Sequence, residues 1–342
     1  MTEHVARGAG RPLRVLWITN MWWEEGAASA RGIFVTQAVD ALRRLGGVEI
    51  DLELVAQGKG SLDYVGANPR VRERWDRGSY DLAHVHYGLT GLATLMLPTA
   101  APLVFTFYGS DVNVPWQRTI AVAAARRARR RIFVSRRLAE RWPDDRNVVL
   151  PNGVDFEAVR PAPREEACRE LGLDPATPRV LFGGRPDNEV KGWPLFEDVL
   201  GRVRARVPDV EPLVLSEPGQ SYARTVAKLN AADVLLFTSR RGSEGSPTVV
   251  KEAAAAGLPV VSTDVGDAPE ILDGVVPGGV IPWPADESAA ARDAWVARLA
   301  DAVTGVLEAR KRSDGREKRG YLRLESIATR LRSIYEEVAA GR

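Results

Sequence analysis

Residues 233–264, DVLLFTSRRGSEGSPTVVKEAAAAGLPVVSTD, form one strand–loop–helix–strand unit. The apolar runs at its two ends contain no alternating polar residues, so they predict strands that are buried on both faces. Between them, Ser246 predicts the N-cap of a helix, Pro247 its first residue and Gly257 its end. Two buried strands joined by a helix predict a parallel pair, and therefore an α/β fold.

Apolar runs of the same kind recur along the rest of the chain and alternate with helical periodicity. One series predicts strands at 13–20, 48–56, 81–87, 102–108, 130–135 and 147–152, and a second at 179–184, 212–216, 233–239 and 258–264. Two series predict two doubly wound, Rossmann-like domains with parallel sheets. The stretch 153–178 is rich in proline and charge and predicts a linker with a short helix, and apolar spacing over 321–340 predicts a late helix.

Composition excludes several classes of function. The chain has 342 residues, 45% of them apolar, and a net charge of +2, which predicts two globular domains without a strong field for nucleic acid. A single cysteine, Cys168, excludes an internal disulfide and a cysteine-based metal site. The three histidines, His4, His84 and His86, are too few for an all-histidine metal centre. We expect no bound cofactor of the dinucleotide kind, since no G-x-G-x-x-G motif follows the first strand.

Two segments bear on membranes. The start of the chain has no apolar core and predicts no signal peptide. Tyr87–Gly109 is uncharged, but Pro98 and Pro102 interrupt it, so we predict a short helix at 91–97, a turn and a buried strand. The basic run Arg126–Arg131 predicts either a solvated helix face or a patch for an anionic membrane surface or acceptor. The expected location is the cytoplasm, with peripheral membrane contact through this run as an alternative.

Glu244 and Glu252 are the carboxylates that invite a catalytic hypothesis. Residues 247–252 alone span about 7.5 Å of helix axis, so the two carboxyl groups are expected about 10 Å or more apart. A retaining glycosidase pair needs about 5 Å, which excludes an acid–base dyad. The spacing instead favours a clamp, because the amides of Thr248 and Val249 at the helix start can bind phosphates between two hydroxyl-binding carboxylates. Two solvated glutamates on a capped surface helix are the alternative.

Cations for such phosphates lie after the first strand of the second series. In RVLFGGRPDNEVKGW, Arg185 directly follows the strand and Lys191 comes six residues later. Both belong to the sheet edge at which α/β proteins bind anions. Taken with the helix start, they predict a site for a nucleotide-diphosphate sugar, although two solvated surface charges are the simpler reading of this loop alone.

These residues carry a resemblance to a known family. The segments ARGIFVTQAVDALRRLG (30–46), DLAHVHYGLTG (81–91), PNGVDFEAVRP (151–161), GGRPDNEVKG (183–192), LNAADVLLFTS (229–239) and EGSPTVVKEAAAAGLPVVSTDVGDAPEIL (244–272) stand in the family's order. The chain resembles the retaining glycosyltransferases of family 4, most closely those of bacterial cell-surface polysaccharide assembly. The resemblance covers nearly the whole chain.

The resemblance implies a GT-B fold, in which two Rossmann-like domains face each other across a cleft. Residues 1–160, together with the last helix at 321–342, would bind the acceptor, and residues 161–320 would bind the donor. The residues implied for the donor site are Gly32, Gly184, Arg185, Lys191, Glu244, Gly245, Ser246, Pro247, Thr248, Val249 and Glu252.

Within this site the resemblance assigns separate roles. Glu244 would contact the donor sugar and Glu252 the ribose. Arg185 and Lys191 would neutralise the departing diphosphate without a metal ion. The base, of UDP or GDP type, stays open. The acceptor would be a sugar or lipid-linked molecule, and the basic run favours an anionic one.

The chain departs from the family pattern at two places. Tyr108 stands where many members carry a histidine, so His86 and Asp111 join Glu244, Arg185, Lys191 and Tyr108 as catalytic candidates. The span from Lys191 to Leu229 is also shorter than usual, which leaves the base-binding wall open. A sugar-nucleotide epimerase or a phosphorylase on the same scaffold, and a non-catalytic nucleotide-sugar-binding subunit, are the alternative functions.

Overall fold

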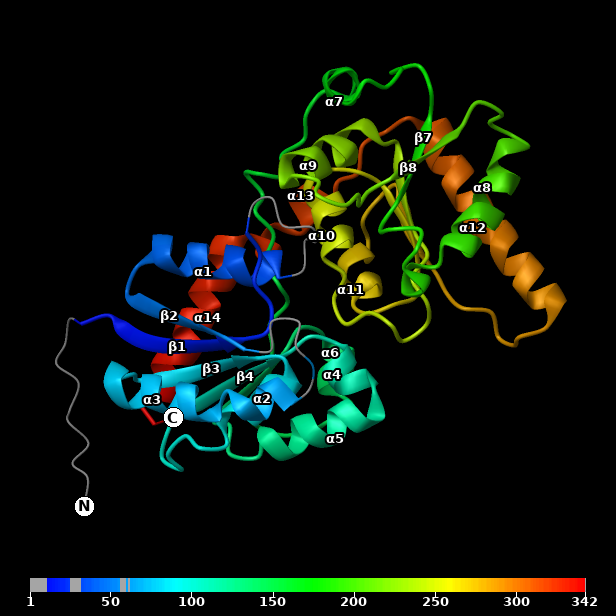
Figure 1. Ribbon diagram of the computed structural model, residues 1–342. Coiled ribbons are helices and arrows are strands. Elements are labelled where there is room, and N and C mark those ends of the chain that lie inside the picture. The colour runs from blue at the N-terminus through cyan, green and yellow to red at the C-terminus, as the bar shows by residue number, and fades with distance from the viewer. Residues whose placement is uncertain (1–10, 25–31, 56–59, 61, 342) are drawn as a thin grey trace.

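The computed structural model describes residues 11–24, 32–55, 60 and 62–341, and it contains two parallel sheets (Figure 1). The first has the order β2-β1-β3-β4-β5-β6 and the second the order β11-β10-β9-β7-β8. The strands of the first sheet are β1 (Leu13–Thr19), β2 (Val48–Leu54), β3 (Leu82–His86), β4 (Leu103–Phe107), β5 (Arg130–Phe133) and β6 (Asn147–Val149). Those of the second are β7 (Arg179–Phe182), β8 (Glu211–Val214), β9 (Val234–Phe237), β10 (Val260–Thr263) and β11 (Gly278–Ile281).

All ten predicted strands are present, and each sheet is doubly wound as predicted. β11 was not predicted. Its four residues, GGVI, contain two glycines and lie at the edge of the sheet, where the strand is only partly buried. Such a strand has neither the length nor the continuous apolar run that marks a buried strand.

Helices cover both faces of each sheet. Those of the first half are α1 (Ile33–Leu45), α2 (Leu62–Gly66), α3 (Asn68–Gly78), the 3₁₀ helix η1 (Gly88–Thr94), α4 (Ser110–Asn113), α5 (Pro115–Ala124) and α6 (Arg136–Ala139). The rest are α7 (Arg164–Leu171), η2 (Glu189–Lys191), α8 (Trp193–Arg204), α9 (Tyr222–Ala231), α10 (Thr248–Ala255), α11 (Ala268–Leu272), α12 (Ala289–Ala309), α13 (Gly315–Lys318), η3 (Gly320–Leu322) and α14 (Leu324–Ala339).

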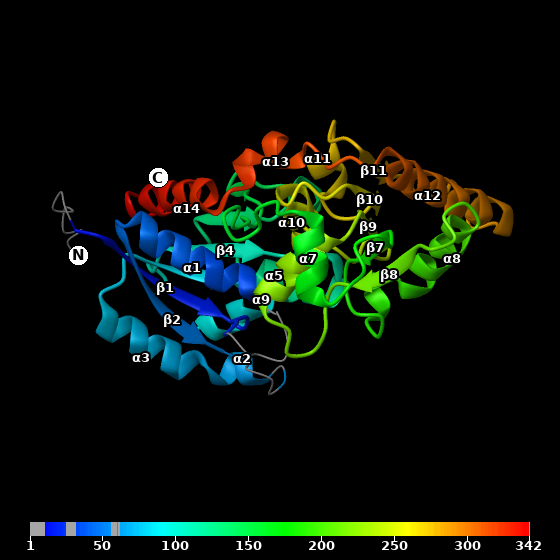
Figure 2. The same cartoon turned by 90° about the horizontal axis from the view of Figure 1, so that it is seen from above.

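The last helix returns to the first sheet. Figure 2 shows α14 beside α1, far from the strands of the second sheet that precede it in sequence. Leu324, Leu331 and Tyr335 of α14 are buried in one core with Val15 and Trp17 of β1. The apolar stripe that predicted this helix therefore forms its contact with the first half of the molecule.

The uncharged stretch 87–109 folds as a short helix, a turn and the buried strand β4. The helix is the 3₁₀ helix η1, and it starts three residues earlier than predicted. Its start is held there because the amide of Gly88 donates to the Asp111 carboxylate over 3.0 Å. Among the described residues, no helix is both long and apolar enough to cross a membrane.

The basic run 126–131 forms neither the solvated helix face nor the anionic-surface patch that the sequence left as alternatives. Arg127 donates to the carbonyls of Thr94, Leu97 and Pro98, which close the end of η1 and the turn after it. Arg131 is 2% exposed and pairs with Asp144 at 2.7 Å. Arg129 and Arg130 contact α14, through the Val338 carbonyl and the Glu337 carboxylate. Most of these guanidinium groups therefore hold the first half together, and Arg126 is the exposed member without such a contact among the described residues.

Candidate functional site

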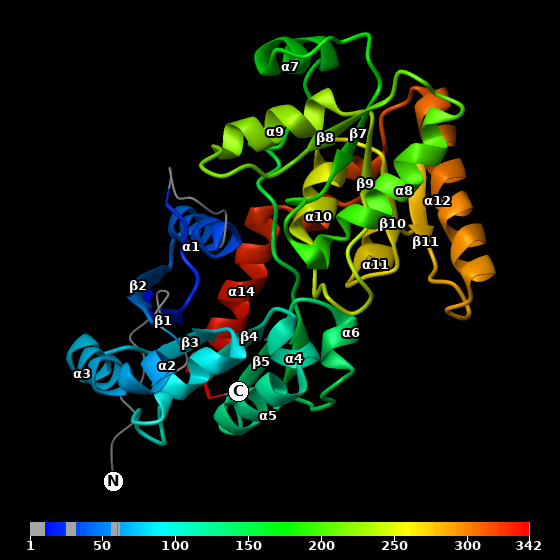
Figure 3. The same ribbon diagram turned by 45° about the vertical axis from the view of Figure 1, so that its right-hand side comes forward.

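A pocket of about 470 Å³ lies between the two halves, over the carboxyl ends of β7 and β9. Figure 3 shows α1 of the first half facing α9 and α10 of the second, and residues of all three helices line the pocket. This is the sheet edge at which doubly wound folds bind ligands. Of the predicted site residues, the pocket collects Tyr108, Gly184, Arg185, Lys191, Glu244, Gly245, Ser246, Pro247, Thr248, Val249 and Glu252. Gly32, His86 and Asp111 do not line it.

The helix start in this pocket differs from the prediction by one residue. α10 begins at Thr248, with Pro247 rather than Ser246 as its N-cap. The Ser246 hydroxyl makes no cap bond because it donates to the buried carboxylate of Asp267. The amides of Thr248 and Val249 occupy the first two helical positions, where helix geometry provides no internal partner. Both residues line the pocket, and an anion bound at a helix start can accept from such amides.

Glu244 and Lys191 form an ion pair at the pocket wall. Lys191 Nζ lies 2.8 Å from Glu244 Oε1, and the Ser239 hydroxyl donates to the same oxygen over 2.7 Å. The Lys191 side chain is 24% exposed and that of Glu244 14%. Oε1 is therefore satisfied by the protein, which leaves Oε2 to accept from a ligand. Ser239 was not predicted, although it ends the apolar run of β9 beside the loop that carries Glu244.

The Glu252 side chain is held by a hydrogen bond from another helix. Its Oε1 accepts a hydrogen bond of 2.8 Å from the Tyr222 hydroxyl of α9. Burial raises the pKa of the Glu252 carboxyl, against the opposing effects of Tyr222 and of the neighbouring Lys251. Lys251 is itself fully buried and donates to the carbonyl of Asn152 over 3.2 Å. Neither Tyr222 nor Lys251 was predicted, because 30 residues separate Tyr222 from Glu252 and nothing in the local sequence links them.

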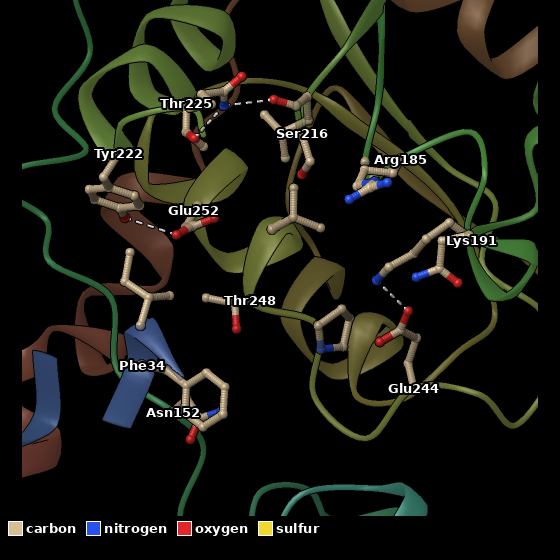
Figure 4. Close-up of a pocket in the computed structure, with 18 of the residues that line it drawn as sticks. Phe34, Asn152, Arg185, Lys191, Ser216, Tyr222, Thr225, Glu244, Thr248 and Glu252 are labelled. Atoms are coloured by element: carbon tan, nitrogen blue, oxygen red, sulfur yellow. Dashed lines mark hydrogen bonds and ion pairs between the residues drawn. The ribbon is translucent and has the colours of Figure 1, made fainter. Parts of the chain in front are cut away.

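Figure 4 shows the two glutamates on opposite sides of the pocket, with Thr248 between them. Glu252 lies beside Tyr222, and Glu244 lies beside Lys191 on the far side. An acid–base dyad on a single bond requires two adjacent carboxylates, and this arrangement does not provide them. It suits an elongated ligand that meets a carboxylate at each end and the helix start in its middle.

Arg185 lines the same pocket. Its guanidinium binds the Asp187 carboxylate, with Nε 2.9 Å from Oδ1. The arginine side chain stays 45% exposed, so its remaining N–H groups are open to a ligand. Together, Arg185 and Lys191 place two cations beside the predicted phosphate site.

Tyr108 lines the pocket from the first half of the chain, and His86, which does not line it, contacts the Tyr108 hydroxyl. The Tyr108 hydroxyl lies 2.6 Å from His86 Nδ1, while His86 Nε2 is buried without a partner in the described structure. Burial raises the pKa of Tyr108 well above its ordinary value, and it lowers the pKa of His86 to about 3. Both groups are therefore neutral at physiological pH. When His86 carries its proton on Nδ1, the Tyr108 hydroxyl is free to donate to a ligand.

Asp111 and Gly32 shape the backbone around the site. The Asp111 carboxylate accepts from the amides of Gly88, Tyr108 and Gly109, at 3.0, 3.1 and 2.8 Å. Burial raises its pKa to about 6. These bonds hold the turn that carries Tyr108. Gly32 has φ +91°, and a Cβ there would lie 2.5 Å from the Trp22 amide nitrogen, so a close approach of two chain segments requires this glycine.

The wall that closes the pocket beyond Glu252 comes from the loop after β8. Its lining residues are Leu215, Ser216, Glu217, Gly219, Gln220, Tyr222 and Thr225. The chain passes from β8 through this loop directly into α9. The remaining pocket residues from the first half and the linker are Ile33, Phe34 and Asn152.

The two halves touch directly beside the pocket. The backbone of Gly245 packs against Tyr108 and Gly109 so closely that a Cβ at Gly245 would lie 1.8 Å from the Tyr108 carbonyl oxygen. Asn113 Nδ2 also donates to the Gly242 carbonyl over 3.0 Å. The loop that carries Glu244 is thereby fixed against the turn that carries Tyr108. Among the described residues, no group of three or more histidine, cysteine or acidic side chains is arranged to hold a metal ion; His4 lies outside those residues.

Comparison with known proteins agrees with this geometry in both halves. Residues 16–158 match the family described as Glycosyltransferase Family 4, and residues 177–307 match the family described as glycosyl transferases group 1. The chain belongs to the family 4 glycosyltransferases. The predicted enzyme class is thus confirmed.

Two relatives of this glycosyltransferase have named activities. Phosphatidyl-myo-inositol mannosyltransferase of Mycobacterium leprae is 29% identical over 324 residues, covering 82% of this chain and 81% of that protein. D-inositol 3-phosphate glycosyltransferase of Pseudarthrobacter chlorophenolicus is 28% identical over 244 residues, covering 58% and 57% of the two chains. Neither name concerns polysaccharide assembly. The relatives therefore support membership of the family, and they do not support the predicted resemblance to enzymes of bacterial cell-surface polysaccharide assembly.

Solved structures share the fold of this glycosyltransferase. Sucrose-phosphate synthase from Thermosynechococcus elongatus matches with a TM-score of 0.73 at 19% identity, over 97% of this chain and 100% of that one. The Anabaena protein Alr3699/HepE, solved in complex with UDP-glucose, matches with a TM-score of 0.59 at 16% identity, over 95% and 100%. The predicted GT-B fold is thereby confirmed.

Proposed function

We propose that this glycosyltransferase transfers a sugar from a nucleotide-diphosphate sugar with retention of configuration and without a metal ion. The observation that carries the proposal is the placement of Glu244 and Glu252 on opposite sides of one pocket, with the start of α10 between them. Glu244 would bind hydroxyl groups of the donor sugar and Glu252 those of the ribose. The amides of Thr248 and Val249 would bind the diphosphate, and the loop after β8 would contact the base.

In the proposed reaction, the bond between the anomeric carbon and the diphosphate oxygen breaks. A bond from the same carbon to the acceptor oxygen forms on the same face, and the acceptor's hydroxyl proton passes to the departing diphosphate. Negative charge therefore develops on the diphosphate. Arg185 and Lys191, which line the pocket, would stabilise that charge in place of a metal ion. Tyr108 would orient the reacting groups by a hydrogen bond.

The acceptor is proposed to carry phosphate, either on a lipid or on a soluble polyol. Both named relatives act on phosphorylated inositol compounds by their names, in keeping with an anionic acceptor. Residues 1–160 with 321–342 would form the acceptor domain and residues 161–320 the donor domain. We propose a cytoplasmic enzyme of glycoconjugate biosynthesis, with polysaccharide assembly as one such pathway, and peripheral at the membrane where the acceptor is a lipid.

A panel of UDP- and GDP-linked sugars tests the proposal. We expect one of them to be hydrolysed or transferred, and the corresponding nucleoside diphosphate to raise the melting temperature. Activity should persist in excess EDTA. Turnover of no donor, together with no thermal protection by UDP or GDP, would contradict the proposal.

A second measurement separates the enzyme from its alternatives. The Glu244→Ala variant should lose turnover by about 10²-fold or more if Glu244 acts on the transition state, whereas a non-catalytic binding subunit would lose only affinity. Release of sugar phosphate that depends on added phosphate would indicate a phosphorylase instead. Conversion of the donor into an epimer would indicate an epimerase.

A further inference from the structure

A second cavity, of about 320 Å³, lies between the two halves. It shares Glu244 with the pocket of about 470 Å³, which we call the donor pocket after its proposed ligand. One wall is formed by the segment from the end of β5 through α6. The other is formed by the loops that follow β9, β10 and β11. We call it the arginine cavity, after Arg137, Arg141 and Arg241, which line it.

Positive charge in the arginine cavity exceeds the negative charge available to balance it. The acidic residues that line the cavity are Glu244 and Asp264. Asp264 is paired with Arg137 at 2.7 Å, and Glu244 is paired with Lys191 on the side of the donor pocket. Within the described ranges, Arg141 and Arg241 have no ion-pair partner. Two guanidinium groups from opposite walls are therefore open to an anion, and guanidinium matches the geometry of phosphate.

Ser135 provides an independent sign of a missing ligand. This residue is 2% exposed and lines the cavity, and its hydroxyl has no hydrogen-bond partner in the structure as described. It stands at the N-cap position of α6, yet its side chain makes no cap bond. A buried hydroxyl without a partner is costly, so such groups call for an explanation. A phosphate oxygen in the cavity would accept from Ser135 and from the arginines together.

Trp283 adds an apolar wall to the charged one. Its indole nitrogen donates to the Asp264 carbonyl over 2.8 Å, and its ring packs against Trp295 with centroids 4.7 Å apart. Leu138 lines the cavity from the other half. A fixed aromatic ring beside cationic and hydroxyl donors suits a ligand that combines a polyol with a phosphate, rather than a bare ion.

We propose that the arginine cavity binds the phosphate group of a phosphorylated acceptor. This assignment rests on the proposed function, in which Glu244 binds the sugar of the donor. Because Glu244 lines both pockets, a ligand in the arginine cavity would lie beside that sugar. The phosphate belongs either to a soluble polyol phosphate or to a lipid headgroup. Arg141 and Arg241 contribute its charge-assisted hydrogen bonds, and Ser135 a neutral one.

The test titrates phosphate into the full-length protein with UDP at saturation, so that the donor pocket is filled. Arg141→Gln and Arg241→Gln remove one charge each, and Arg136→Gln on α6 is the matched control, since it is exposed and does not line the cavity. We expect inorganic phosphate and glycerol 3-phosphate to bind about tenfold more weakly to each cavity variant, and unchanged to the control. The affinity for UDP should be unchanged in all three.

Separate arms identify the source of the phosphate. Flotation with phosphatidylcholine vesicles containing phosphatidylglycerol, lost in the cavity variants but not in Arg136→Gln, would assign a lipid headgroup. Glycerol 3-phosphate binding without flotation would assign a soluble acceptor. Equal phosphate affinity in wild type and both cavity variants would overturn the proposal. The cavity variants could bind phosphate more weakly while the wild type turns over no nucleotide sugar. In that case the cavity is an anion-binding site, but both the proposed function and the assignment of the anion to an acceptor are contradicted.

Discussion

The hydroxyl of Tyr108 lies 2.6 Å from Nδ1 of His86, so the donor pocket is lined by a tyrosine whose position a buried histidine controls. His86 in turn packs against the indole of Trp17, with ring centroids 4.1 Å apart. The pair joins the end of β3 to the turn after β4.

Removing the Tyr108 hydroxyl should affect turnover more than donor binding. For Tyr108→Phe we expect kcat to fall about ten- to hundredfold, because a hydrogen bond in the transition state is lost while the ring still packs against Phe34. UDP affinity should change little. Steady-state kinetics with the identified donor, together with UDP calorimetry, measure both. A kcat equal to that of wild type would leave Tyr108 with a packing role alone.

His86 should make folding stability depend on pH. Its pKa is lowered to about 3 by burial, against 6.5 for an ordinary histidine. Below pH 6.5 the unfolded chain therefore binds a proton that the folded chain does not, and stability falls as the pH is lowered through that window. At about pH 5 this amounts to about 2 kcal/mol. Urea unfolding at about pH 7.5 and about pH 5 should show that the His86→Gln variant loses less stability than wild type by this amount. Equal losses would mean that His86 titrates normally in the folded state.

Substitutions at Lys191 and Glu244 should have different effects, the first on donor binding and the second on turnover. Lys191→Met removes a phosphate-binding cation, so we expect about tenfold weaker UDP binding. Glu244→Gln keeps the size of the side chain but loses its charge, so we expect kcat to fall about 10²-fold with little change in UDP affinity. Glu189→Gln is the control, because its side chain is 84% exposed and pairs with Arg240 on the surface. A Glu244→Gln enzyme that lost only donor affinity would contradict the catalytic assignment.

Gly245 should be required for the contact between the two halves. A Cβ there meets the Tyr108 carbonyl oxygen at 1.8 Å, so Gly245→Ala should push the Glu244 loop away from the Tyr108 turn. We expect a large loss of activity and an increased radius of gyration in X-ray scattering. Gly305→Ala in α12 is the control, since its Cβ meets no atom within 4 Å and alanine favours a helix by about 0.5–1 kcal/mol. Normal activity in Gly245→Ala would show that this contact is dispensable.

Arg131 and Arg126, in the same basic run, should behave differently. Arg131→Met removes a buried guanidinium that pairs with Asp144 and lies over the Trp142 ring. We therefore expect the free energy of unfolding to fall by about 2–3 kcal/mol. Arg126→Met, on the surface, should change stability by less than about 0.5 kcal/mol. Urea denaturation measures both. If both variants changed the free energy of unfolding by less than about 0.5 kcal/mol, Arg131 would contribute no more to stability than an exposed arginine does.

Much of the site was predictable because it follows from local order along the chain. A strand that ends at Ser239, a loop that carries Glu244 and a helix that begins near Thr248 must lie at one sheet edge, since parallel strands place their carboxyl ends together. The same reasoning brought Arg185 and Lys191 to that edge. The N-cap was misplaced by one residue because Asp267, 21 residues later, takes the Ser246 hydroxyl.

Sequence alone determined the α/β fold, the two series of strands and the pocket residues that directly follow β7 and β9, because apolar periodicity and helix signals act between neighbours in the chain. Tertiary structure decided the rest. It placed Tyr222 on Glu252 and His86 on Tyr108, it used most of the basic run as internal support, and it brought Arg141 and Arg241 together across the two halves. These contacts join residues far apart in sequence, and their geometry depends on how two separately folded sheets pack against each other.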